Sequence, residues 1–149
     1  MELTHFHNYY LQLCEWDIPT KKKVRILGEL MASAYDNHWR VVGITKEALN
    51  VFQAHNFKKV SRMGINRGHI YDRNETFTYM LENPGAFETA EDWWNFFYNR
   101  DKTILMTGTE NMSGKLSEHY EVPEGLFHAS GYAWRHGKEE VEFLTELAK

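Results

Sequence analysis

The chain of 149 residues has few of the features that mark secreted, metal-stapled or membrane proteins. Its single cysteine, Cys14, excludes an intramolecular disulfide and a cysteine-rich zinc module. No apolar run approaches the roughly 20 residues that cross a bilayer. The first residues have neither the basic part nor the unbroken apolar part of a signal peptide. We therefore expect a cytoplasmic protein without a membrane partner.

The composition is that of an ordinary globular protein. With 42% hydrophobic and 26% charged residues, wholesale disorder is excluded. Hydrophobic periodicity predicts helices over 3–15, 20–37, 45–55, 75–82, 90–98, 109–119 and 138–148, and strands near 39–44, 65–71, 102–107 and 132–134. We expect an α+β fold, in which a single, mainly helical domain over 1–149 surrounds a small antiparallel sheet.

The charge is unevenly distributed along the chain. The net charge of −4 disfavours a nucleic-acid partner. However, residues 56–73 carry a balance of +4, from Lys58, Lys59, Arg62, Arg67 and Arg73 against Asp72 alone. A basic segment in an acidic chain indicates either an anion-binding face or a solvated loop, and charge leaves both interpretations open.

The segment Asn66-Arg67-Gly68-His69 lies at the end of this basic stretch, and Glu110-Asn111 follows the strand expected over 102–107. Together they resemble the Asp-Arg-Gly-His motif and the asparagine-bearing helix of ββα-metal (His-Me finger, HNH-like) endonucleases, with Asn66 in place of the aspartate. The resemblance implies a ββα-metal finger over residues 62–119. Residues 1–60 would be a helical support region, and residues 120–149 would add a C-terminal strand and helix.

The resemblance also implies a role for each candidate residue. Phosphodiester hydrolysis needs a base that activates water and a divalent cation that stabilises the developing charge. We expect His69 to be the base, Asn111 to bind Mg²⁺ or Mn²⁺, and Arg67 and Glu110 to assist catalysis. His119 could replace or join Asn111 at the metal. The residues expected to contact DNA are Lys58, Lys59, Arg62, Arg67, Arg73 and Lys115.

Each of these residues also has a structural interpretation, and the function has alternatives of other classes. His69 could be a hydrogen-bonded structural histidine, and Asn111 a turn or cap residue. Beside a DNA endonuclease of phage or bacterial mobile-element origin, we consider a non-catalytic module that binds nucleic acid or protein. This includes an inhibitor that uses its acidic surface. Because one chain has few basic residues with which to grip a duplex, a homodimer is an open alternative to a monomer.

The C-terminal part adds one further pattern. Tyr132, Trp134, Arg135 and His136 mix aromatic and basic side chains. This mixture permits contact with a nucleic-acid backbone but is not specific to it.

Overall fold

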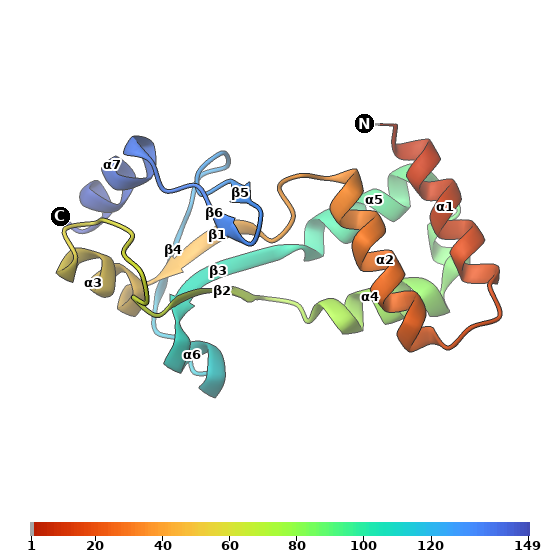
Figure 1. The fold of residues 1–149 in the computed structure, drawn as a ribbon, viewed down its shortest axis with the longest axis horizontal. Helices are drawn as coiled ribbons and strands as arrows, with labels where there is room; N and C mark the ends of the chain where they lie inside the picture. The colour runs from red at the N-terminus through yellow and green to blue at the C-terminus, as the bar shows by residue number, and fades with distance from the viewer. Residues whose placement is uncertain (1) are drawn as a thin grey trace. The chain divides into compact units, whose positions relative to one another are not determined.

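The structure, a computed structural model that describes residues 2–149, combines helices with a four-stranded sheet and a two-stranded hairpin (Figure 1). This confirms the expected α+β class and its mainly helical character. Contacts divide the chain into two compact units. The helical unit runs to His38 and includes Tyr71–Asp101, and the α/β unit contains Trp39–Ile70 and Lys102–Lys149. No helix within the described residues is long and apolar enough to cross a bilayer.

The helical unit contains α1 (Leu3–Glu15), α2 (Thr20–Ala34), α4 (Arg73–Glu82), the 3₁₀ turn η1 (Pro84–Phe87) and α5 (Ala90–Arg100). Their apolar faces form one core, which includes Tyr10, Leu27, Met31, Phe77, Met80, Trp93 and Phe97. The Tyr10 hydroxyl donates a hydrogen bond of 2.6 Å to the Met80 carbonyl. The region expected as the nuclease core, 62–119, is therefore divided. Its middle part, 71–101, packs with the N-terminal helices because α4 and α5 bury their aromatic side chains there.

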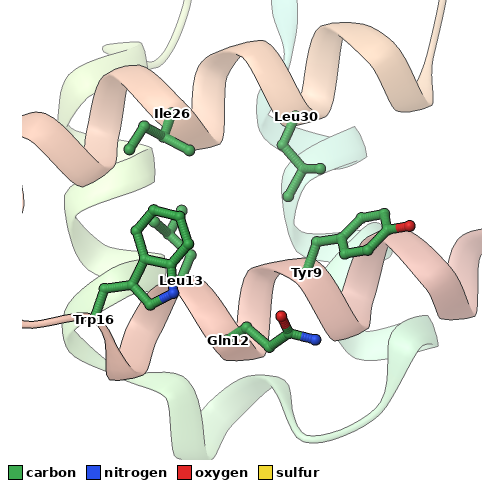
Figure 2. A pocket seen from close by; sticks show the side chains of 6 residues that line it. All are labelled: Tyr9, Gln12, Leu13, Trp16, Ile26 and Leu30. Carbon is green, nitrogen blue, oxygen red and sulfur yellow. The ribbon is translucent and has the colours of Figure 1, made fainter.

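A small apolar pocket lies between α1 and α2 (Figure 2). Tyr9, Leu13 and Trp16 line it from α1 and its C-cap, while Ile26 and Leu30 face them from α2. Tyr9 and Trp16 each keep about half of their area exposed, at 54% and 53%. The pocket is thus a surface feature rather than part of the buried core.

The α/β unit contains β1 (Arg40–Thr45), α3 (Lys46–Ala54), β2 (Ile65–His69), β3 (Lys102–Thr107), α6 (Gly108–Ser113), β4 (His119–Glu121), the hairpin strands β5 (Ala129–Ser130) and β6 (Ala133–Trp134), and α7 (Lys138–Leu147). The sheet order is β2-β3-β1-β4. Strands β2 and β4 run antiparallel to their neighbours, whereas β1 and β3 are parallel. The sheet is therefore mixed and not antiparallel throughout. The chain reverses direction once through α3 and again through α4, η1 and α5, so β1 and β3 run in the same direction.

One face of this sheet contributes to the core of the α/β unit. Ile44 from β1 and Leu105 from β3 pack there with Phe52 of α3 and Leu144 of α7. Thr45 caps α3, accepting a hydrogen bond from the Ala48 amide. The opposite face carries Gly43 and Gly68, whose positions pair with the same residue of β3, Ile104.

The helix expected over 109–119 is shorter in the structure. It ends at Ser113 because Gly114 adopts the left-handed conformation, with φ of 71°, and its amide caps the Glu110 carbonyl. His119 consequently lies in β4 and not on the helix that carries Asn111.

Candidate nucleic-acid interface

Strands β2 and β3 pair antiparallel and α6 directly follows β3, although α4, η1 and α5 lie between β2 and β3 in the chain (Figure 1). Side chains alternate between the faces along β2, so Asn66 and Gly68 point to one face and Arg67 and His69 to the other. A Cβ at Gly68 would lie 3.0 Å from Asn111 Oδ1, which places the Asn111 amide on the Gly68 side. Asn111 is exposed there.

His69 points to the face away from Asn111. Its ring packs edge-on against Trp39, with centroids 4.4 Å apart and planes at 72°. Its Nε2 atom is buried from solvent. The structure therefore does not bring His69 and Asn111 together around one open pocket, because neighbouring residues of a strand point to opposite faces. His69 is a packed residue in this geometry.

His119 does share the Gly68 face with Asn111. The Cδ2 atom of His119 lies 3.5 Å from the position of a Cβ at Gly43, which is in register with Gly68 across the sheet. Among residues 2–149, no three His, Cys, Asp or Glu side chains gather closely enough to hold a metal ion. Asn111 lies against β2 and His119 against β1, and β3 separates these strands by roughly 9–10 Å in total, so the structure does not place the two side chains on one cation.

Glu110, expected to assist catalysis, is instead a buried structural residue. Its carboxylate accepts hydrogen bonds from Thr45 Oγ1 at 2.6 Å, from the Thr107 amide at 3.1 Å, and from both the amide and the hydroxyl of Ser117 at 2.8 Å. Burial opposes ionisation, but these donors outweigh it and lower the pKa of Glu110 to about 2. The carboxylate thereby joins β1, α6 and the segment before β4.

On the His69 face, basic and aromatic side chains gather in what we call the cation–aromatic cluster: Trp39, Lys59, Arg67, His69 and Trp134, together with Tyr132, which joins it through its backbone carbonyl. Lys59 Nζ lies 3.9 Å from the centroid of the Trp134 ring. The guanidinium carbon of Arg67 lies 5.4 Å from the Trp39 ring and 5.9 Å from the Trp134 ring. These distances are within the range of cation–π attraction.

The two cations of the cluster are close enough to affect each other. Burial lowers the pKa of Lys59, and the positive charge of Arg67 lowers it further. An anion beside Lys59 would oppose both effects, because it would stabilise the charged ammonium. The site is therefore electrostatically suited to a negatively charged ligand.

The backbone of Trp39 has an uncommon conformation that supports the cluster. Its φ of 61° is in the left-handed region, which is a genuine outlier for a bulky residue. The Trp39 carbonyl accepts hydrogen bonds from Thr103 Oγ1 at 3.1 Å and from Arg67 Nη1 at 3.4 Å. These bonds hold the indole against His69 and Arg67 despite the strain.

The hairpin that carries Tyr132 and Trp134 is fixed at its base. Arg67 Nη2 donates a hydrogen bond of 3.1 Å to the Tyr132 carbonyl. Arg135 bonds to the buried Glu140 carboxylate at 3.2 Å and to the Gly125 carbonyl at 2.7 Å. Glu140 also accepts from the Gly137 amide at 2.8 Å and from the Phe127 amide at 3.1 Å. Burial opposes ionisation, but these donors and Arg135 outweigh it and lower the pKa of Glu140.

The remaining predicted contact residues are separated by the fold. Lys58 and Arg62 are exposed in the loop between α3 and β2, beside Lys59 in sequence. Lys115 is exposed after α6. Arg73 belongs to the helical unit, where its Nε lies 4.0 Å from Asp101 Oδ1 and its guanidinium covers the Phe77 ring. Arg73 therefore packs within that unit and is not part of the cluster.

The two units differ in the sign of their net charge. The α/β unit has eleven Lys and Arg against nine Asp and Glu, a net charge of +2. The helical unit has six against twelve, a net charge of −6. Apart from Arg73, the cations of the basic stretch are therefore in the more positive of the two units.

The sequence interpretation missed Trp39 and underrated the segment 132–136, whose mixture of aromatic and basic residues was the available signal. Comparison with protein-family models, with curated proteins and with solved structures gives no match to this chain.

Proposed function

We propose that this protein binds nucleic acid through the cation–aromatic cluster of its α/β unit. The observation that carries the proposal is the position of two cations at one ring: the Lys59 ammonium lies 3.9 Å and the Arg67 guanidinium carbon 5.9 Å from the Trp134 ring centroid. Exposed Lys58 and Arg62 extend the positive charge along the same loop. Phosphates spaced along a strand suit such a row of cations, and bases supply flat faces for aromatic contact.

The proposal predicts that replacing Lys59 by glutamine weakens nucleic-acid binding and makes that binding less dependent on salt. The logarithm of the association constant falls linearly with the logarithm of the salt concentration. If Lys59 neutralises one phosphate, Lys59→Gln makes this negative slope shallower by about 0.9 for a duplex or about 0.7 for a single strand. Affinity should fall several-fold at low salt. Fluorescence anisotropy of a labelled oligonucleotide, titrated at several salt concentrations, measures both quantities.

Lys138→Gln is the matched control, since it removes the same charge from a side chain on α7 that is 90% exposed. It should change the slope less than Lys59→Gln. Equal effects of the two variants, or no binding by the parent chain at low salt, would contradict the proposal. Binding of a basic protein without nucleic-acid binding would instead support an inhibitor that uses the acidic helical unit. A homodimer stays a prediction.

A second candidate is a Mg²⁺- or Mn²⁺-dependent DNA endonuclease. The observation that favours it is the antiparallel pairing of β2 with β3, which α6 directly follows, with Asn111 Oδ1 against Gly68. On that face Asn111 is the group available for a hydrated cation, while His69 points away. This candidate therefore assigns the chemistry to the α6 face and DNA binding to the cation–aromatic cluster.

Nicking of a supercoiled plasmid in the presence of either metal tests this candidate. Asn111→Ala is expected to abolish nicking, because a metal ligand would be lost, while far-ultraviolet circular dichroism stays unchanged. Glu118→Ala, at another exposed position, provides the control. Absence of nicking by the parent chain, or nicking that persists in Asn111→Ala, would exclude the α6 face as the catalytic centre.

A further inference from the structure

Tyr132 is the most exposed aromatic residue of the cation–aromatic cluster. It lies between β5 and β6, where Gly131 adopts a φ of 61° to let the chain turn. Its side chain is fully exposed, whereas Trp39 and Trp134 are each partly buried. A large aromatic side chain that lies fully in water adds no burial energy to the stability of the free protein.

The tryptophan rings of the cluster already have cationic or aromatic neighbours. Trp134 has Lys59 against its ring and Arg67 near it. Trp39 has the edge-on His69 ring and Arg67. Tyr132 is therefore the cluster's ring whose faces are most accessible to a ligand.

The backbone of Tyr132 is held next to the cations. Arg67 Nη2 donates to its carbonyl at 3.1 Å, and Trp134 two residues later is the ring that Lys59 covers. The hairpin base is held by the bond between Arg135 and Glu140. An exposed ring on a backbone anchored beside two cations can contact a base while the cations contact the adjoining phosphates.

We propose that Tyr132 stacks on an unpaired base, so that the cluster selects single-stranded over double-stranded nucleic acid. This inference rests on the proposed nucleic-acid binding and specifies its substrate. In a duplex, each base is stacked on its neighbours and paired, so its flat face is not available to a side chain. Cations alone would bind both forms through their phosphates, and the stacking ring supplies the difference.

The test compares binding of a labelled oligothymidylate of roughly twelve nucleotides with binding of a duplex of equal length. The parent chain should bind the single strand more tightly. Tyr132→Ala should weaken single-strand binding at least about fivefold and leave duplex binding within about twofold of the parent. Tyr132→Phe keeps the ring and should retain most of the single-strand preference. Tyr9→Ala, which removes a half-exposed tyrosine from the helical unit, is the matched control.

The outcomes separate the two proposals. If the parent binds both forms equally and Lys59→Gln weakens both, nucleic-acid binding stands and the stacking role of Tyr132 is overturned. If Tyr132→Phe loses as much affinity as Tyr132→Ala, the contact is made by the hydroxyl and stacking is again overturned. If the parent binds neither form, the proposed function itself fails.

Discussion

Replacing Glu110 by alanine is expected to lower the free energy of unfolding by about 3–5 kcal/mol. The carboxylate is buried and accepts bonds from Thr45, Thr107 and Ser117, at distances between 2.6 and 3.3 Å. Without it, the amides of Thr107 and Ser117 lose their acceptor in a site with little access to water. Urea denaturation of the parent and the variant at neutral pH measures the difference.

The same carboxylate predicts a defined loss of stability in acid. Its pKa is lowered from the ordinary 4.5 to about 2, so the folded state holds the proton less tightly than the unfolded state. This contributes about 3 kcal/mol that is fully present above the unfolded pKa and is lost as the pH falls through the folded pKa. The stability difference between the parent and Glu110→Ala should therefore narrow from about pH 5 toward pH 2.

Glu118→Ala is the control, because Glu118 is exposed in the segment between α6 and β4. This substitution should change the free energy of unfolding by less than about 0.5 kcal/mol. A difference between the parent and Glu110→Ala that is constant over this pH range would show that the ionised carboxylate is not responsible. A catalytic role for Glu110 would predict instead a lost activity with unchanged stability.

Replacing Glu140 by alanine is expected to destabilise the protein by about 3 kcal/mol and also to weaken nucleic-acid binding. Glu140 is 1% exposed and accepts from the Phe127 and Gly137 amides and from Arg135. Its loss loosens the segment that carries Tyr132 and Trp134, because the Arg135 guanidinium loses its buried acceptor, while its bond to the Gly125 carbonyl, its weak pair with Glu139 and the bond from the Arg135 amide to the His128 carbonyl remain. Urea denaturation and anisotropy titration, both below the unfolding temperature, measure the two effects.

The two buried glutamates provide a matched pair for this experiment. Glu110→Ala should destabilise the protein to a similar degree but affect binding less, because Glu110 anchors α6 and not the hairpin. Glu142→Ala, at an exposed position on α7, should affect neither property strongly. Equal losses of binding in Glu110→Ala and Glu140→Ala would show that binding follows global stability and not the hairpin's position.

Much of the secondary structure follows from local pattern. The helix over 3–15 and the strand over 102–107 have the predicted bounds, because each is a periodic segment between clear breaks. The Thr89 side chain caps α5 through the Asp92 amide, as the spacing of these two residues predicts. The helix expected over 75–82 begins two residues earlier, at Arg73, because the Asp72 side chain caps α4 by accepting a hydrogen bond from the Glu75 amide. Capping depends on where the preceding loop turns, which neighbouring sequence specifies only loosely.

The candidate site depends on contacts between distant segments. If β2 paired with β3 one residue out of register, Arg67 and His69 would point to the face that Asn66 and Gly68 now occupy. The sequence of the motif is compatible with either register and so does not decide the face. The face is set by long-range pairing of β2 with β3 and by what packs on each side. Arg67 likewise contacts carbonyls 28 and 65 residues away in the chain. Residue order therefore specifies helices, strands and the basic loop, whereas the meeting of cations and rings arises from folding, which joins segments that no local pattern links.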